Sequence, residues 1–416
     1  MNIFNQRNKK QSTKFLMLCL VIISFASCNK PEKKDPITNA ENQLSLLLKN
    51  TDENFNGQFN PETDSNSSYL PRSINKNKKI KLVNTGDWCS GFFPGCLWEI
   101  YELTGDKKWE KSALRFTLPI ENQKFNGGTH DMGFKMTPSF GKAYKFTGDT
   151  TYRNILIQSA KTLITRYNPT IGCIRSWDHN KDKWQFPVII DNMMNLELLF
   201  WATQETGDSV YYNIAVSHAK TTMKNHFRKD YSCYHVVDYN PETGAVNQKI
   251  THQGYSDESS WARGQGWALY GFTMVYRETH NKIFLEQAKN VAAYILNFPG
   301  MPEDLIPYWD YMAPDIPNAP RDASAAAVTA SALYELSSYV QDPDKAFYLQ
   351  KANKIVNSLS TKYISKPGAN YGFILEHSTG HKPGNSEIDV PIIYSDYYYL
   401  EALIRKTNIT KSNNVK

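Results

Sequence analysis

A short phrase recurs along this sequence and limits the folds that the chain can adopt. Its full copies are Leu103-Thr-Gly-Asp106, Phe146-Thr-Gly-Asp149 and Glu205-Thr-Gly-Asp208, and its degraded copies are Glu278-Thr-His-Asn281 and Val340-Gln-Asp-Pro343. In each copy the glycine or its equivalent suits the C-cap of one helix, and the residue that follows suits the N-cap of the next. The phrase therefore predicts a series of helical hairpins.

Twelve segments place apolar residues with the period of an amphipathic helix. They cover residues 38–49, 89–104, 107–123, 131–147, 150–166, 191–206, 209–227, 258–279, 282–297, 321–340, 344–360 and 391–405. Twelve helices in six pairs predict an all-α fold in which two concentric rings of helices close on themselves. An open helical scaffold is the alternative, but repeats of unequal spacing with long loops on one side favour the closed ring.

Long connections lead into the second helix of each pair, whereas the turns that leave it are short. Four of them cover residues 167–190, 228–257, 298–320 and 361–390. We expect them at one end of the ring, over the N-termini of the inner helices, because binding sites usually form on loops that a rigid scaffold holds. Strand-like runs at 173–178 and 234–239 predict short β arms on this face.

The N-terminal residues have the pattern of an export signal. Within residues 1–27, basic side chains precede an apolar run from Phe15 to Phe25 and then small residues. Cys28 follows them, as at a bacterial lipoprotein cleavage site, so we expect a lipid on Cys28. The apolar run is too short for a stable membrane span. We therefore expect a tether at 28–37 and one catalytic domain at 38–416.

The composition of the tether indicates on which side of the membrane the protein is anchored. Lysines are mixed in the tether with Glu32 and Asp35 and no acidic block is present, which favours the periplasmic side of the envelope.

The formal net charge of the chain is +6, but four positive charges and no negative ones lie in residues 1–27, so the rest of the chain is only about +2. That balance does not indicate nucleic-acid binding.

Four cysteines lie beyond the export signal, and none has the spacing of a metal ligand. They are Cys89, Cys96, Cys173 and Cys233, with no CxxC pair and no histidine at a matching distance. Cys89 and Cys96 are too far apart along one predicted helix for a disulfide. We expect buried thiols, no metal site and no cofactor.

Two aspartates stand out among those that precede inner helices. An aspartate in this place is usually an N-cap, which stabilises a helix by about 1 kcal/mol. Asp191, however, follows the apolar run Phe186–Ile190. This approach should desolvate its carboxyl and raise its pKa, which suits a general acid. Asp131 lies beside His130 and follows Gly127-Gly128, where the backbone can come close to a ligand.

Aromatic and cationic side chains accompany these aspartates. Arg263 and Trp267 are four residues apart, so on one helix face they would offer a cation beside an aromatic plate, which suits an acidic sugar. A helix-helix contact would explain the same pair. His235, with tyrosines on a strand-like arm, is by itself more typical of a structural histidine. The chain is 13% aromatic, and sugar rings stack on such side chains.

Taken together, these residues resemble glycoside hydrolase family 88, the unsaturated glucuronyl hydrolases, from about residue 38 to the C-terminus. The segments that carry the resemblance are Trp88, Asn126–Phe134, Ser176-Trp177, Ile189–Leu196, His235, Thr251–Gly254 and Trp261–Trp267. The resemblance implies an (α/α)6 barrel. It also implies removal of a 4,5-unsaturated uronic acid from the non-reducing end of lyase products, by hydration of the vinyl ether double bond.

The resemblance also implies roles for individual residues. Asp191 would be the general acid/base and Asp131 would hold the sugar hydroxyls near the double bond. Tryptophans would form walls that stack on the sugar, and further polar residues would contact the substrate or its water. These residues are Trp88, Trp177 and Trp267 for the walls, and His130, His235, Gln253 and Arg263 for the contacts. No nucleophile, covalent intermediate or metal is required.

The segment His377–Pro383 departs from the family pattern. Some members use serine and lysine here to favour a sulfate on the second sugar; this chain keeps Lys382 but has Gly380 and His381 where a further hydroxyl is expected. The sulfate preference therefore stays open, and a solvated lysine is an equal alternative. Two other functions also stay open, namely an unsaturated rhamnogalacturonyl hydrolase acting on pectin fragments and a glycan-binding lipoprotein without activity.

Overall fold

The computed structural model describes residues 35–54 and 67–414. The predicted signal peptide and lipidated Cys28 lie outside these residues. The described residues form one compact unit. Its first helix begins at Pro36, two residues before the predicted start, because Asp35 accepts a hydrogen bond from the backbone N–H of Thr38 and opens the helix.

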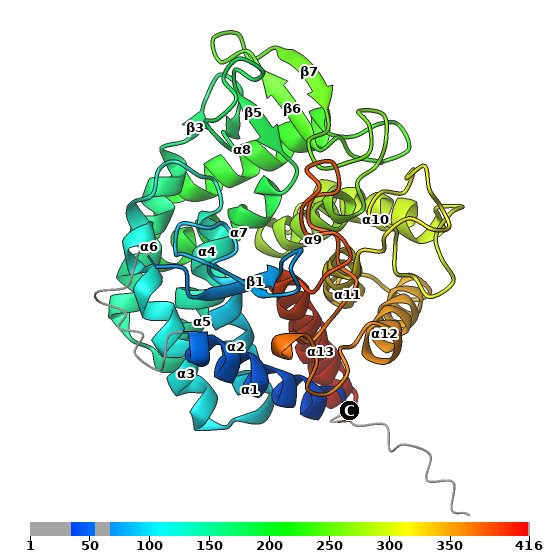
Figure 1. Ribbon diagram of the computed structural model, residues 1–416. Coiled ribbons are helices and arrows are strands. Elements are labelled where there is room, and N and C mark those ends of the chain that lie inside the picture. The colour runs from blue at the N-terminus through cyan, green and yellow to red at the C-terminus, as the bar shows by residue number, and fades with distance from the viewer. Residues whose placement is uncertain (1–34, 55–66, 415–416) are drawn as a thin grey trace, which may run out of the picture. The chain divides into compact units, whose positions relative to one another are not determined.

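The inner ring consists of six helical positions that pack in sequence. They are α2 (Phe92–Thr104), the series α4 (Met132–Met136), η2 (Thr137–Gly141) and α5 (Lys142–Thr147), then α7 (Asn192–Thr206), α9 (Ala262–Thr279), α11 (Ala323–Ser337) and α13 (Ile393–Asn414). Each packs on the next, and α13 packs on α2, so the ring closes (Figure 1). This closure confirms the (α/α)6 barrel and rules out an open array.

The outer helices cover the inner ring. They are α1 (Pro36–Asn54), α3 (Lys107–Thr117), α6 (Thr150–Ile164), α8 (Ser209–Asn225), α10 (Lys282–Asn297) and α12 (Asp344–Lys362). Inner helices are buried almost all round, as in α9, where every residue from Ala262 to Val275 is buried. Outer helices bury one face only, as their amphipathic sequences require.

The recurring phrase forms the turns that it predicts. Gly105, Gly148 and Gly207 take left-handed φ values of 72°, 69° and 74° at the ends of inner helices, where glycine has no steric cost. The aspartate after each then accepts a hydrogen bond from a backbone N–H in the first turn of the next helix. The inner helix therefore passes to its outer partner through a short, fully capped turn.

Two predicted helices are interrupted, in both cases at a proline. Pro138 lies inside the predicted helix 131–147, and the chain forms the single wide turn η2 there, because proline has no N–H for the regular ladder. Pro119 ends the predicted helix 107–123 early, and residues Leu118–Phe125 continue as the 3-10 helix η1.

The β arms lie on the predicted face, together with one hairpin that we did not predict. Strands β3 (Tyr167–Asn168) and β4 (Cys173–Ile174) pair, and β5 (Pro187–Ile189), β6 (Val236–Tyr239) and β7 (Val246–Ile250) form an antiparallel sheet. The unpredicted hairpin joins β1 (Leu70–Ile74) to β2 (Ile80–Val83). It lies beside the segment before α13, where Ser73 bridges to Ile392 (Figure 1).

The four described cysteines are free and buried, as expected. Cys89 lies before α2 rather than on it, so the predicted helix began too early. Among the helices that the structure describes, none combines the length and the apolar character needed to cross a membrane.

Candidate active site

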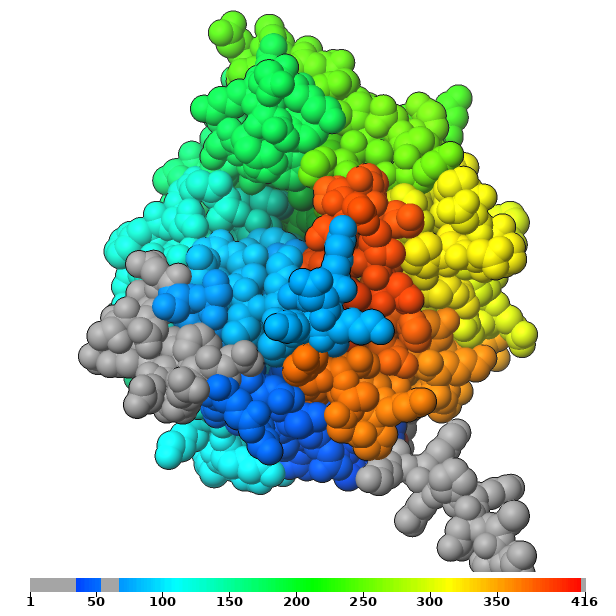
Figure 2. Space-filling model, in the orientation of Figure 1, coloured from blue at the N-terminus to red at the C-terminus, as the bar shows by residue number. Residues whose placement is uncertain are grey.

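A cavity of about 390 Å³ opens at the N-terminal ends of the inner helices, where the long connections meet. Figure 2 shows the hollow between segments drawn in green, light blue and orange-red. Seven of the ten predicted site residues line this cavity, namely Trp88, His130, Asp131, Trp177, Asp191, Gln253 and Arg263. Its volume is in the range of small-ligand sites.

Asp191 lies where the buried strand β5 passes into α7. It is 8% exposed and occupies the N-cap position of α7, yet its side chain makes no capping hydrogen bond. Its Oδ2 atom is buried without a hydrogen-bond partner among the described residues. Burial raises the pKa of Asp191 to about 7, although Arg263 acts in the opposite direction. The desolvation expected from the apolar approach is therefore present.

His235 lies next to Asp191, and its tautomer follows from its neighbours. Its Nδ1 accepts hydrogen bonds from the backbone N–H groups of His252, at 3.1 Å, and Gln253, at 3.0 Å. Burial lowers the pKa of His235 well below its usual range, so the ring is neutral. Its one proton must then be on Nε2, which is 3.6 Å from Asp191 Oδ2. The sequence predicted that His235 lies on a β arm, but its position next to Asp191 is evident only from the fold.

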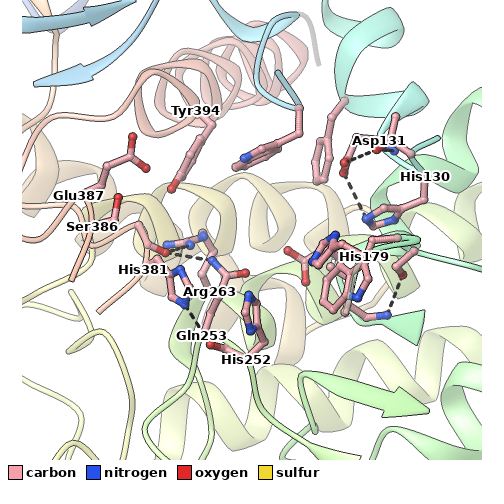
Figure 3. Close-up of a pocket in the computed structure, with 18 of the residues that line it drawn as sticks. His130, Asp131, His179, His252, Gln253, Arg263, His381, Ser386, Glu387 and Tyr394 are labelled. Carbon is pink, nitrogen blue, oxygen red and sulfur yellow. Dashed lines mark hydrogen bonds and ion pairs between the residues drawn. The ribbon is translucent and has the colours of Figure 1, made fainter. Parts of the chain in front are cut away.

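Asp131 lies across the cavity, before α4. It also stands at an N-cap position without making a capping bond. Its Oδ2 accepts a hydrogen bond from the Thr129 hydroxyl at 2.6 Å, and its Oδ1 is 3.3 Å from His130 Nε2 (Figure 3). Burial lowers the pKa of His130, so this contact is made by a neutral ring. Neither Asp131 nor Asp191 is used as a helix cap.

Arg263 and Trp267 do not form the pair that their spacing suggested. Arg263 stacks on Trp261 and Tyr394, and it binds Asp322 at 2.9 Å and the backbone carbonyls of Thr379 and Gly380. Trp267 is fully buried between Phe134 and Tyr398 and does not line the cavity.

A fully buried indole is not available to stack on a sugar, so the predicted wall role of Trp267 does not fit this geometry. It lies one turn further along α9 than Arg263, with its ring packed against Phe134 and Tyr398. It nevertheless lies close to Asp191. Burial, the largest influence, raises the pKa of Asp191, and Trp267 is among the groups that lower it.

The other two tryptophans face the cavity. Trp88 packs edge-on against Phe134 and Phe92 and lies under the guanidinium of Arg72 at 5.7 Å. Trp177 stacks on His179, with ring centroids 5.1 Å apart. Both rings are therefore held by neighbours and present an apolar surface to a ligand.

The loop before α13 closes one side of the cavity. Gln253 Nε2 donates a hydrogen bond to the Gly380 carbonyl at 3.0 Å, and Gly380 and His381 line the cavity. Lys382 is half-buried on the same loop but does not line the cavity. It therefore stands beside the site rather than in it.

Several lining residues were not among the predicted site residues, although His252 and His381 lie in segments that the sequence singled out. They are Arg72, His179, His252, His381, Ser386 and Glu387. Arg72 binds Asp87, 15 residues away in the sequence, at 2.8 Å, and Glu387, 315 residues away, at 2.7 Å, so that the second ion pair joins β1 to the last long loop. No local pattern signals such a contact. The histidines lie in predicted loops, but nothing in their spacing indicated that they meet.

A raised pKa does not by itself mark a catalytic group. Burial raises the pKa of Asp396 to about 8, but this residue accepts hydrogen bonds from the N–H groups of Ile374 and Leu375 and does not line the cavity. Asp191 differs because it faces the cavity with an unused oxygen. In the part of the chain that the structure describes, no three acidic, histidine or cysteine side chains come together as metal ligands would.

Asp191, Asp131 and the aromatic walls together define a class: a helical-barrel enzyme with acid-base chemistry in a cavity suited to a sugar. The unsaturated glucuronyl hydrolase of Formosa agariphila is 52% identical over 343 residues, which is 82% of this chain and 85% of that protein. The unsaturated chondroitin disaccharide hydrolase of Streptococcus agalactiae is 36% identical over 80% of this chain and 85% of its own length.

Solved structures agree with these sequence relatives. The crystal structure of an unsaturated glucuronyl hydrolase specific for heparin superposes with a TM-score of 0.84 at 47% identity, covering 90% of this chain and 98% of that one. The sequence pattern of Glycosyl Hydrolase Family 88 matches residues 64–408. The chain belongs to this family and is therefore a glycoside hydrolase.

Proposed function

We propose that this protein is an unsaturated glucuronyl hydrolase, which removes a 4,5-unsaturated glucuronic acid from the non-reducing end of lyase-generated oligosaccharides. One observation carries the proposal: Asp191, whose pKa is raised to about 7 by burial, faces a cavity of sugar size with an unused oxygen. Relatives that are named for glucuronyl and chondroitin disaccharide hydrolysis support glycosaminoglycan fragments as the substrate class.

The reaction begins with transfer of a proton from Asp191 to C4 of the double bond. The ring oxygen supplies the electron pair that stabilises the positive charge at C5. Water then adds to C5, and the ionised Asp191 takes a proton from that water. The resulting hemiketal opens, and the second sugar leaves from C1 as an alcohol, so that the net reaction consumes one water.

A pKa near 7 suits both steps that Asp191 performs. A donor works best when it is largely protonated at the working pH and is still acidic enough to release its proton. His235 acts as a positioning residue: its protonated Nε2 lies 3.6 Å from Asp191 Oδ2, just beyond hydrogen-bond distance, and orients the carboxyl once this contact shortens. The separation of 3.6 Å leaves room for the contact to shorten when substrate enters.

The substrate carboxylate needs a hydrogen-bond donor, but the two arginines that line the cavity, Arg72 and Arg263, are already ion-paired. Both terminal nitrogens of Arg263 are taken by Asp322 and by backbone carbonyls, whereas its Nε has no acceptor among the described residues. We assign this Nε, with Gln253, to the carboxylate. Asp131, held by Thr129, is assigned to the sugar hydroxyls, with His130 as its neighbour. Trp88 and Trp177 supply the stacking surfaces.

The test is a panel of unsaturated oligosaccharides from hyaluronan, chondroitin, heparin and pectin lyases, followed by loss of the ultraviolet absorbance of the double bond. Turnover of the glycosaminoglycan fragments is expected. Turnover of pectin fragments alone would instead identify a rhamnogalacturonyl hydrolase. Binding of fragments without any turnover would identify a glycan-binding protein.

Lys382 is the candidate for an acidic group on the second sugar, from its place beside the cavity. Lys382→Ser should then lower kcat/KM for a sulfated unsaturated disaccharide more than for its unsulfated counterpart. Equal effects on the two substrates would assign Lys382 to the solvated surface.

Export and lipidation of Cys28 are the remaining parts of the proposal, and they rest on the pattern of residues 1–28. Metabolic labelling with a fatty acid should mark the wild-type protein in the membrane fraction, facing the periplasm. Cys28→Ser should abolish the label. An unlabelled, released wild-type protein would overturn the anchor without affecting the proposed activity.

A further inference from the structure

A second hollow of about 580 Å³ runs along the β1–β2 hairpin, outside the active-site cavity. One wall is the hairpin, and the other is the segment 385–390 before α13; we call it the hairpin groove. Its lining residues are Ile74, Asn75, Lys76, Lys78, Lys81, Asn385, Ser386, Glu387, Ile388 and Val390. Ser386 and Glu387 also line the active-site cavity, so the two hollows are neighbours that share part of a wall.

The hairpin carries concentrated positive charge. Between Leu70 and Gly86 the sequence has five basic residues and no acidic residue. Lys76 and Lys78 are exposed, and neither has an ion-pair partner in the described part of the chain. Two neighbouring lysines without ion-pair partners, on one side of a groove, attract anions.

The acidic residue in the groove does not cancel this charge. Glu387 has a side chain only 5% exposed, and it accepts hydrogen bonds from Arg72, Ser73 and Lys81. Burial acts to raise its pKa, but Arg72 and Lys81 outweigh this and lower the pKa of Glu387 to about 2. Its negative charge is therefore compensated by Arg72 and Lys81 within the protein and does not neutralise Lys76 or Lys78.

The groove is held in shape before any ligand arrives. The ion pair between Arg72 and Glu387 fastens its two walls together, and Ser73 bridges to Ile392. At the tip, the hydroxyl of Tyr371 donates a hydrogen bond to the backbone carbonyl of Lys78 at 3.1 Å. A preformed site loses less free energy on binding than one that must be ordered.

We propose that the hairpin groove binds the sulfate or carboxylate groups of sugars that lie beyond the second sugar of a longer substrate. This inference rests on the proposed function, since it requires an acidic oligosaccharide whose unsaturated end occupies the cavity. Ser386 and Glu387 line both hollows, so a chain that leaves the cavity on their side enters the groove that Lys76 and Lys78 line. The lysines would then discriminate by chain length.

The experiment compares a sulfated unsaturated disaccharide with the corresponding tetrasaccharide, using Lys76→Gln/Lys78→Gln. Each exposed ion pair typically contributes about 0.5 kcal/mol, so loss of two of them should lower kcat/KM for the tetrasaccharide about fivefold. The disaccharide should be unaffected. The difference should vanish at high salt, because exposed charges are screened. The matched control is Lys345→Gln/Lys354→Gln on the outer helix α12, where both lysines are exposed; it should change neither substrate.

A binding measurement separates this inference from the proposed function. Asp191→Asn protein, with and without the two hairpin substitutions, is titrated with the tetrasaccharide by calorimetry. Weaker binding by the hairpin variant supports the groove even if the wild type turns over neither substrate, a result that would overturn only the proposed function. Equal binding, or an equal loss of kcat/KM on both substrates, would overturn the groove.

Discussion

Asp191 at the mouth of the barrel and Glu335 toward its opposite end are both carboxylates on the inner ring with little exposed surface, but their surroundings differ. Their side chains are 12% and 9% exposed. Glu335 is bound by Arg277 at 3.0 Å and by Arg405 at 2.7 Å. Among the described residues no Lys or Arg side chain binds Asp191, and the nearby Arg263 is bound to Asp322.

The consequence appears in the protonation of the two groups. Burial acts to raise the pKa of Glu335, but Arg405 and Arg277 outweigh it and the pKa is lowered. Glu197, for which Arg277 is the one bound cation among the described residues, keeps a raised pKa because burial, the largest influence, is reinforced by Glu401 and Glu335. Burial therefore does not decide protonation by itself; the balance between bound cations and neighbouring carboxylates also counts. The mouth therefore holds a protonated carboxyl, Asp191, whereas at the far end Glu335 forms ion pairs with Arg277 and Arg405 that connect helices α9, α11 and α13.

Asp191→Asn should produce the largest effect and tests the mouth of the barrel. A positioned acid or base typically contributes 10²–10⁴ to the rate, so kcat should fall by roughly 10³-fold. Substrate affinity should be retained, because the amide keeps the shape of the carboxyl. The measurement is loss of double-bond absorbance together with calorimetric binding. Activity within tenfold of wild type would remove Asp191 from the chemistry.

Arg405→Met tests the opposite end. The substitution removes the cation that binds Glu335 and that contacts Glu401 at 3.7 Å. Breaking a buried pair from one side costs about 3–5 kcal/mol, so the free energy of unfolding should fall by that amount. Urea denaturation measures it, and kcat of the folded protein should not change. A loss of kcat without a loss of stability would show that the two ends are coupled.

The pH dependence of stability should have opposite sign at the two carboxyls. The folded protein keeps the Asp191 proton up to about pH 7, whereas the unfolded chain loses it near 4. Stability is therefore lost as pH rises through this window, by on the order of 3–4 kcal/mol. Asp191→Asn should be more stable than wild type at pH 8 and equal to it at pH 4, as judged by urea denaturation at the two pH values.

Glu335→Gln is the matched counterpart. Because its folded pKa is lowered, Glu335 contributes stability above its ordinary pKa, and this is lost as pH falls through the lowered value. The glutamine variant should therefore be less stable than wild type at neutral pH and approach it in acid. If both variants shifted stability in the same direction, cation binding would not distinguish the two regions.

His235→Phe should have the smallest effect of the series. The phenylalanine ring has no N–H to place beside Asp191, and kcat should fall by about tenfold, because one hydrogen bond to a charged group is worth about 1.5 kcal/mol. The substitution should also move the basic limb of the pH profile of kcat upward, because a donor near a carboxylate favours the ionised form. A fall in kcat with no movement of this limb would assign His235 a purely structural role.

Sequence predicted the barrel well because its signals are local. Gly-Asp turns, apolar periodicity and the one-sided long loops are each read within a few residues, and they gave the ring, its order and the face that holds the site. The two interrupted helices were missed because Pro119 and Pro138 lie within otherwise regular apolar patterns. The β1–β2 hairpin was missed because its residues are largely basic and polar.

The candidate site was predictable only in part, because side-chain partners come from distant segments. Asp191 had a local signal in the apolar approach of β5, and its pKa bears that signal out. Arg263 and Trp267 had a local signal that misled, since helical spacing cannot tell which face meets the mouth. Arg72 and Glu387 had none, because their contact joins opposite ends of the chain.

The most direct test of the account is titration of Asp191 itself. Infrared difference spectra between wild type and Asp191→Asn, recorded across pH, isolate the carboxyl stretch of this one group. The account predicts a protonated carboxyl below neutrality that ionises at about pH 7, in parallel with the loss of kcat on the basic side. A carboxylate that is already ionised at pH 5 would contradict it, because the barrel mouth would then hold no acid.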